Sequence, residues 1–274
     1  MLYLVATPIG NLSDISQRAL DTLSNSDYIL CEDTRHTVQL LSHFNLKKPL
    51  KSFHKFNETF KEETIIKDLH SGKIISLVSD AGTPGISDPG ALLVKRCVDE
   101  NITVISIPGP CAAIVALTCS GLDTDRFQFF GFLPKKKEEL KRTLQEILRY
   151  PGTTICYESP FRLVDVLKEI EQLDASRQLV VARELTKKFE EIHRGSAEMQ
   201  IKYWSTYTLK GEIVLLISAQ TNQEEPDWNT LSPEEHVQFL ETTYRLSRQD
   251  AIKMAAKIRG VPKRSIYNKL LNEE

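Results

Sequence analysis

Residues 79–90, with the sequence SDAGTPGISDPG, place the strongest constraint on how this chain folds. They join a short apolar run, KIISLV, to a stretch with helical character, ALLVKRCVDE, and contain three glycines, two prolines and two aspartates. Glycine lets a backbone approach a ligand closely, and proline stiffens a loop. A simple turn needs only one or two such residues, so we expect a ligand-binding loop at the carboxyl end of a buried strand. Asp80 would offer its carboxylate to that ligand, and Asp88 is predicted to cap the following helix.

Apolar runs alternate with helical patterns over the first 120 residues. Strands are expected within LYLVAT, DYILCED, PLKSF, KIISLVSD and NITVISIPG, and a capping box in DISQ, residues 14–17, is expected to open the first helix. The runs are continuous in apolar residues, as in strands that helices cover on both faces. The predicted fold class is therefore α/β with a largely parallel sheet.

A second αβ unit and then a helical tail are predicted after the segment CSGLDTD. We expect an N-terminal αβα domain with the ligand loops over residues 1–119, a second αβα domain over 120–220, a polar linker, and a small helical module over 230–274. In the module, capping boxes are predicted at Ser232 and Ser247, and a helix end at Gly260. This pattern fits either a helix-turn-helix or a generic three-helix appendage.

The formal net charge of −2 conceals two basic segments. Residues 245–274 hold eight Lys or Arg against three Asp or Glu, and KKKEELKR at residues 135–142 holds five against two. Such patches bind phosphate groups in nucleic-acid-binding proteins, and they also occur as ordinary solvated surfaces. Both interpretations stay open from charge alone.

The cysteines and histidines show no metal-binding spacing. The five cysteines are scattered without a CxxC pair, which is typical of reduced thiols in a cytoplasmic protein. The apolar runs are shorter than the roughly 18 residues that a membrane span needs, and the first residues lack the basic start of a signal peptide. We therefore expect a cytoplasmic protein without a metal.

The glycine spacing in residues 79–90 differs from the two common phosphate-binding patterns, G-x-G-x-x-G and G-x-x-x-x-G-K-[ST]. Glu32 and Asp33 end the second predicted strand, where a carboxylate could hold a ribose, but the loop after the first strand lacks the matching glycine triplet. Two further Pro/Gly loops, ATPIGN at residues 6–11 and IPGPCA at residues 107–112, follow other strands. Three such loops at three strand ends are expected to wall one cavity.

The segments VATPIGNLSDI, EDTR, SDAGTPGISDPG, IPGPCA and GFLP, in this order, resemble the tetrapyrrole (corrin/porphyrin) methylase superfamily. The full set is similar to the ribosomal RNA small subunit methyltransferase I subfamily, which methylates the 2′-hydroxyl of a cytidine in 16S rRNA. The resemblance covers about residues 1–220 and implies S-adenosylmethionine in a cleft between two αβα domains, and a homodimer. Alternatives are a methyltransferase of the same fold acting on a tetrapyrrole or corrinoid precursor, and a non-enzymatic nucleic-acid adaptor that uses the tail.

The resemblance also implies which residues line the cofactor site. Cys111 is a departure, because relatives often have serine there and a thiol is a poorer hydrogen-bond donor. Arg183, Glu184 and Glu212 match further strand-end positions of the family pattern. The cofactor-binding positions carried over are Pro8, Asp80, Gly82, Thr83, Ala112, Tyr157, Leu185 and Gly211.

The implied reaction transfers a methyl group in line from a sulfonium to a ribose oxygen. Correct positioning can supply roughly 7–11 kcal/mol, whereas a general base contributes about 10²–10⁴-fold, so the base need not be obvious in the sequence. Arginines could bind RNA phosphates or form surface ion pairs, and the aromatic run RFQFFGF could stack on bases or pack as a strand. Candidate bases or orienting groups are Glu32, Asp33, His36, Glu158 and Glu184, and candidate RNA contacts are Arg35, Arg162 and Arg183.

Overall fold

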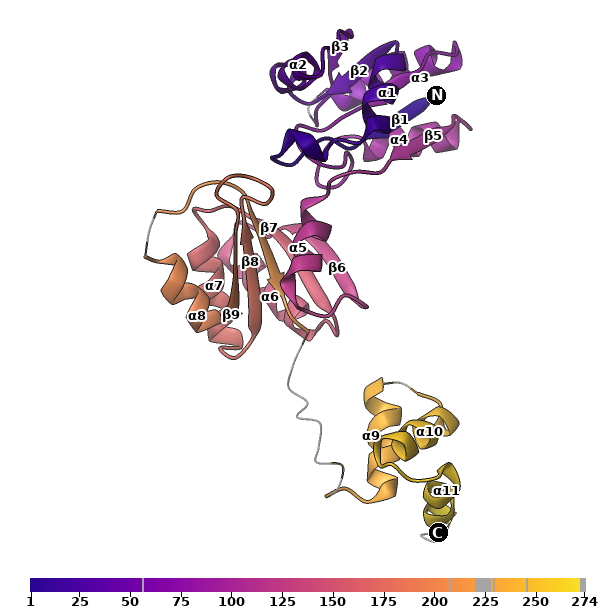
Figure 1. Cartoon of the computed structure of the whole chain (residues 1–274), viewed down its shortest axis with the longest axis vertical. Helices are drawn as coiled ribbons and strands as arrows, with labels where there is room; N and C mark the ends of the chain where they lie inside the picture. Colours follow the sequence, from indigo (N-terminus) through magenta and orange to yellow (C-terminus); the bar gives the residue numbers. More distant parts are fainter. Residues whose placement is uncertain (56, 207, 220–227, 229, 245, 272–274) are drawn as a thin grey trace. The chain divides into compact units, whose positions relative to one another are not determined.

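The computed structural model describes the 274-residue chain except for residues 56, 207, 220–227, 229, 245 and 272–274 (Figure 1). It divides into two compact units, residues 1–220 and residues 221–274, which are described separately below. Most of the linker predicted at residues 221–230 lies outside the described residues. None of the described helices is long and apolar enough to cross a membrane.

The first half of the larger unit is built on a five-stranded parallel sheet of order β3-β2-β4-β1-β5. Apolar side chains of α3 and α4 pack on one face, and those of α1 and α2 pack on the other. This explains why the strands are continuous in apolar residues, as the sequence predicted. The strands are β1 (Leu2–Val5), β2 (Tyr28–Cys31), β3 (Leu50–Ser52), β4 (Ile75–Leu77) and β5 (Val104–Ile107), and the helices are α1 (Gln17–Asn25), α2 (Thr34–His43), α3 (Glu58–His70) and α4 (Ala91–Asp99).

The second half contains a mixed sheet of order β6-β7-β10-β8-β9. Only the β6–β7 pair is parallel, because β10 runs antiparallel to both of its neighbours and β8 and β9 form an antiparallel pair. The strands are β6 (Phe127–Phe132), β7 (Thr153–Glu158), β8 (Gln178–Arg183), β9 (Glu191–Ser196) and β10 (Ile213–Ile217). The helices are α5 (Ala112–Ser120), α6 (Lys137–Arg149), α7 (Leu163–Leu173) and α8 (Ala197–Trp204).

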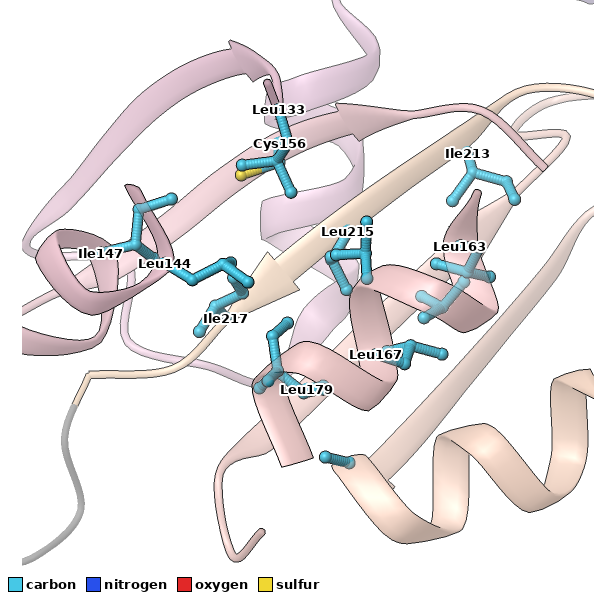
Figure 2. Packing of buried hydrophobic residues seen from close by; sticks show 14 of the residues in the cluster. Leu133, Leu144, Ile147, Cys156, Leu163, Leu167, Leu179, Ile213, Leu215 and Ile217 are labelled. Atoms are coloured by element: carbon cyan, nitrogen blue, oxygen red, sulfur yellow. The ribbon is translucent and has the colours of Figure 1, made fainter. Parts of the chain in front are cut away.

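The central strand β10 is buried on both of its faces. Leu215 and its alternate neighbours pack against side chains such as Leu144 of α6 and Leu167 of α7 (Figure 2). Val214 and Leu216 belong to the opposite core cluster, together with the apolar residues of α5. Helix α5 therefore covers the second sheet, although it precedes the boundary predicted after residue 119 and follows a strand of the first sheet.

Two predicted helix starts differ from those in the structure. Helix α1 is capped by Ser16, whose hydroxyl accepts from the Ala19 amide, and the predicted Asp14 box instead lies in a 3₁₀ turn, Leu12–Asp14. Helix α4 begins after Gly90, which has φ of +124° and makes no side-chain cap. Asp88 is therefore not a cap: the backbone turns through glycine, and the Asp88 side chain is left to line a cavity.

The described residues of the smaller unit form three helices, α9 (Pro233–Tyr244), α10 (Arg248–Ile258) and α11 (Lys263–Leu271). The predicted caps are confirmed: Ser232 and Glu235 bond each other's backbone, and the Ser247 hydroxyl accepts from the Asp250 amide. Gly260 follows α10 in the left-handed conformation, with φ of +63°. The shared core consists of Val237, Leu240, Ala251, Ile252, Ala255, Ala256 and Ile266.

Candidate functional site

The three Pro/Gly loops of the first half are joined by hydrogen bonds. The Thr7 and Gly82 backbones bond each other in both directions, at 2.9 and 3.0 Å, and the Thr7 hydroxyl reaches the Ser79 carbonyl at 3.2 Å. The Thr83 hydroxyl donates to the Pro110 carbonyl at 3.0 Å. Loops that leave three different strands are thus held together, as their sequences predicted.

These loops and the second sheet line a cavity of about 400 Å³, the acidic cavity. Ile9 comes from the first loop, residues 80–83 and 86–88 from the second, and Cys111 with Ala112 from the third. The other wall contains Phe132 and Tyr157, whose rings meet edge to face at 5.7 Å. Of the eight predicted cofactor positions, the lining includes Asp80, Gly82, Thr83, Ala112, Tyr157, Leu185 and Gly211.

The polar lining of the acidic cavity is dominated by carboxylates. Asp80 and Asp88 contribute from the glycine loop, and Glu158 and Glu212 from the second sheet. The lining residues, all of which lie in the described part of the chain, include no Lys, Arg or His. Because opposite charge stabilises an ionised carboxylate, this cavity suits a ligand with positive charge and disfavours an anion.

In two of the four carboxyl groups, burial disfavours the ionised form. Burial, together with the charge of Glu32, raises the pKa of Asp88 to about 6. Burial also raises the pKa of Glu158, against the opposing effects of the Ser159 amide at 2.7 Å and the Arg162 guanidinium at 3.4 Å. The second oxygen of Glu158, Oε2, is buried without a hydrogen-bond partner among the described residues. A cationic ligand would stabilise the charged form of both groups.

Gly211 and Glu184 form a close contact behind the cavity wall. A Cβ on Gly211, at φ of +95°, would lie 2.4 Å from Cδ of Glu184. Oε1 of Glu184 accepts from the Glu212 amide at 3.0 Å and from Nζ of Lys187 at 2.9 Å, and these contacts lower the pKa of Glu184 against the effect of burial. Glu184 itself has φ of +51°, an unusual conformation for a residue with a side chain. We infer that Glu184 holds the Gly211 turn in place.

A second cavity, of about 330 Å³, adjoins the acidic cavity. The two share Ile9, Asp80, Ala81 and Glu212, so they are two ends of one cleft. Unlike the acidic cavity, this one contains basic side chains, those of His36 and Lys187. The remaining lining residues are Thr7, Pro8, Gly10, Leu12, Thr37, Gln39, Leu40 and Ser79.

Asp33 and Arg35 pair with each other at the start of α2. Asp33 caps this helix by accepting from the Arg35 amide at 2.8 Å, and the Arg35 guanidinium bonds both Asp33 oxygens. These bonds lower the pKa of Asp33 to about 2. The Asp33 amide donates to Oδ1 of Asp80 at 3.0 Å, which helps to fix that carboxylate in the lining of both cavities. Glu32 is not among the residues that line either cavity.

The other two candidate arginines bond to backbone carbonyls. Arg162 donates to Leu133 at 3.1 Å and to Pro134 at 2.6 Å, and Arg183 donates through Nε to Lys210 at 2.8 Å. These bonds tie loops of the second half together and leave fewer donors for a phosphate.

Two charged lining residues were not assigned to the site by sequence reasoning. Asp88 was interpreted as a helix cap, because Asp-Pro often precedes a helix. Lys187 was not considered, because it reaches the second cavity only through the fold: its side chain packs against Gly10, where a Cβ would lie 2.3 Å from Cγ of Lys187. The glycine at position 10 was the available signal, since a close backbone approach requires one.

A family model of tetrapyrrole (corrin/porphyrin) methylases matches residues 1–199. The chain belongs to this family. Solved structures of other proteins share the fold at low identity. One is a diphthine synthase, with a TM-score of 0.62, 15% identity and coverage of 80% of this chain and 90% of that chain. Another is uroporphyrin-III C-methyltransferase from Thermus thermophilus complexed with S-adenosylhomocysteine, with a TM-score of 0.55, 16% identity and coverage of 78% and 96%. The predicted fold class is confirmed.

Curated relatives within the tetrapyrrole methylase family are far more similar in sequence. The ribosomal RNA small subunit methyltransferase I of Halalkalibacterium halodurans is 45% identical over 97% of this chain and 93% of its own length. Proteins with the same name from Escherichia coli O157:H7 and Bacillus subtilis are 44% and 42% identical, over 100% and 98% of this chain and 95% and 93% of their own lengths. The likeness therefore extends through the helical tail.

Proposed function

We propose that this protein is an S-adenosylmethionine-dependent methyltransferase that modifies the 2′-hydroxyl of a cytidine in 16S rRNA of the small ribosomal subunit. Relatives named ribosomal RNA small subunit methyltransferase I, 42–45% identical over nearly the whole chain, support this assignment. The structural observation that carries it is the acidic cavity, which is enclosed by both halves of the larger unit and holds four carboxylates.

The acidic cavity fits S-adenosylmethionine in size and charge. Its volume of about 400 Å³ lies in the range of small-molecule sites. The ligand carries a sulfonium and an ammonium group, and these cations would stabilise the ionised forms of Asp88 and Glu158, whose pKa values are raised mainly by burial. When bound, it supplies an electrophilic methyl group. The residues proposed to hold it are Asp80, Gly82, Thr83, Ala112, Tyr157, Leu185 and Gly211, with Pro8 on the side of the second cavity.

We place the acceptor ribose in the second cavity. It adjoins the acidic cavity at Asp80, so a sugar there would meet the methyl donor at the shared edge. Lys187, whose ammonium lies between Glu184 and Glu212, gives this cavity a cationic hydrogen-bond donor. The acidic cavity lacks such groups and would repel an RNA phosphate.

The helices α10 and α11 support an RNA partner. Their described surface, residues 246–271, is rich in Lys and Arg, with Asp250 as the acidic residue, whereas α9 contains no Lys or Arg. Helix α11 also contains Tyr267, which is 51% exposed. Cations with an aromatic side chain suit RNA, because phosphates bind to the former and bases stack on the latter. The basic residues are Arg248, Lys253, Lys257, Arg259, Lys263, Arg264 and Lys269.

A homodimer and a cytoplasmic location are also proposed, on the family resemblance. Large apolar side chains on the surface of the larger unit are compatible with a subunit interface. Phe60, Phe161 and Phe189 are 86%, 83% and 66% exposed, respectively.

Transfer of label from tritiated S-adenosylmethionine to reconstituted small subunits tests the proposed function. We expect label in 16S rRNA at a 2′-O-methylcytidine located by mass spectrometry. Unlabelled rRNA with labelled corrinoid precursor would favour the tetrapyrrole alternative, and no heat of binding with S-adenosylmethionine in calorimetry would favour the adaptor. Asp80→Ala should abolish cofactor binding with an unchanged melting curve, so retained affinity would contradict the site assignment.

A further inference from the structure

Most of the candidate general bases are already engaged in the structure. Both oxygens of Asp33 accept hydrogen bonds from Arg35, and its pKa of about 2 makes it a weak base. Glu184 accepts from Lys187 and from the Glu212 amide, and lies behind Gly211 rather than on the cavity surface. Glu32 lines neither cavity.

Glu158 lines the acidic cavity but is poorly placed to receive a proton from a sugar. Its side chain is 0% exposed, and its unpaired oxygen Oε2 is inaccessible to solvent. It also belongs to the cavity assigned to the methyl donor and is absent from the lining of the second cavity. A hydroxyl group could reach it only if the surrounding side chains moved.

His36, unlike the candidate carboxylates, is both accessible in the second cavity and oriented by a neighbouring side chain. It lies in the first turn of α2, lines the second cavity, and has a side chain that is 63% exposed. Its Nδ1 atom is 3.4 Å from Oδ2 of Asp80, whose other oxygen is held by the Asp33 amide at 3.0 Å. No partner for Nε2 is found among the residues that the structure describes. The imidazole is therefore oriented through one nitrogen and open at the other, and such contacts are often long before substrate binds.

We propose that His36 is the general base for methylation of the ribose hydroxyl and that Asp80 is the residue that positions it. The inference rests on the proposed function. Nε2 of His36 accepts the proton as the hydroxyl O–H bond breaks and the oxygen–methyl bond forms. The sulfur–methyl bond breaks with its electron pair staying on sulfur, and His36 later releases the proton to solvent.

The charged groups around His36 are largely paired with one another. On its own helix, Arg35 is neutralised by Asp33. Across the second cavity, Lys187 lies between Glu184 and Glu212. Asp80, from the end of β4, remains as the carboxylate that faces the imidazole directly, at the point where the two cavities meet. Asp80 can therefore stabilise the imidazolium that forms during transfer.

The test compares His36→Ala and His36→Gln with wild type in the full-length protein, using reconstituted small subunits. A positioned base contributes about 10²–10⁴-fold, so we expect kcat to fall by that factor in both variants. The KM for subunits and the calorimetric affinity for S-adenosylhomocysteine should stay within about twofold. Added imidazole should partly restore His36→Ala, and the acidic limb of the wild-type pH–rate profile should disappear in both variants.

His43→Ala is the matched control, because His43 ends the same helix and lines neither cavity. It should behave as wild type. Three results would overturn the proposal: a kcat of His36→Ala within a few-fold of wild type, full activity in His36→Gln, or a raised KM with unchanged kcat. Wild-type protein that leaves 16S rRNA unmethylated would instead contradict the proposed function, so the two failures are distinguishable.

Discussion

Replacing Asp88 with Asn tests whether the ionised Asp88 side chain lowers the stability of the free protein and strengthens binding of a cationic ligand. The carboxyl group lines the cavity, and burial with the charge of Glu32 raises its pKa from an ordinary 3.8 to about 6. Asn has nearly the same shape without the charge. The substitution should therefore stabilise the protein and weaken binding of S-adenosylmethionine.

The sign and size follow from linkage between protonation and folding. Because the folded protein binds the Asp88 proton more tightly than the unfolded chain, wild-type stability falls as pH rises from about 4 to about 6, and stays reduced above that range. A shift of about two pKa units corresponds to about 3 kcal/mol, which is an upper limit. Since Asp88 is partly exposed, solvent screening reduces the effect to about 1–2 kcal/mol.

Thermal melting of Asp88→Asn and wild type between pH 4 and pH 7.5 measures this effect. We expect the variant to melt a few degrees higher at pH 7.5, with the difference shrinking toward zero near pH 4. Calorimetry at pH 7.5 should show affinity for S-adenosylmethionine reduced by on the order of tenfold, the loss of one charge interaction worth about 1.4 kcal/mol. A variant that melts lower at pH 7.5, or that differs equally at every pH, would refute the reasoning.

Two further variants test the Gly211 turn of the larger unit and the basic surface of the smaller unit. Gly211→Ala places a methyl group 2.4 Å from Glu184 at φ of +95° and should cost about 2–3 kcal/mol in urea unfolding, with loss of cofactor affinity. Gly72→Ala, at φ of +90° with nothing within 4 Å, controls for backbone strain alone, and an equal effect would exclude the clash. The double variant Lys257→Glu, Arg264→Glu should weaken rRNA binding. The slope of log binding constant against log salt concentration should become shallower by about 0.7–0.9 per lost phosphate contact. Lys95→Glu on α4 is the control, and salt curves that all coincide would argue against RNA binding by α10 and α11.

Local signals explain why much of the fold could be predicted. The parallel sheet follows from strands that are apolar throughout, since each must be covered on both faces. Caps in the smaller unit depend on residues three apart, Ser232 with Glu235 and Ser247 with Asp250, and need no tertiary information. At the first helix, however, Asp14 and Ser16 both offered acceptable caps, and the local sequence did not decide between them.

Strand direction in the second sheet could not be predicted for a different reason. The run IVLLI of β10 is buried on both faces and would be equally apolar in a parallel or an antiparallel position. Direction is set by the connections, here a strand that enters between β7 and β8 after the α8 helix. Apolar periodicity contains no information about this choice.

The candidate site shows the same division between local and distant signals. Loops rich in glycine and proline predicted the cavity, because their conformational needs are visible in the sequence. The pairing of His36 with Asp80 and the approach of Lys187 to Gly10 join residues far apart in the chain. The first contact depends on the pairing of β2 with β4, and the second on how the two halves pack, and sequence patterns alone specify neither.

Charge separation along the cleft accounts for both binding and release in the proposed reaction. The acidic cavity attracts a cationic donor and repels RNA phosphates, whereas Lys187 places an ammonium group in the cavity next to it. We therefore expect an RNA chain to approach the donor from the side of Asp80, which lines both cavities. Methyl transfer removes the positive charge from sulfur, so the same carboxylates hold the product less tightly than the donor. The same carboxylates therefore favour binding of the methyl donor and release of its demethylated product.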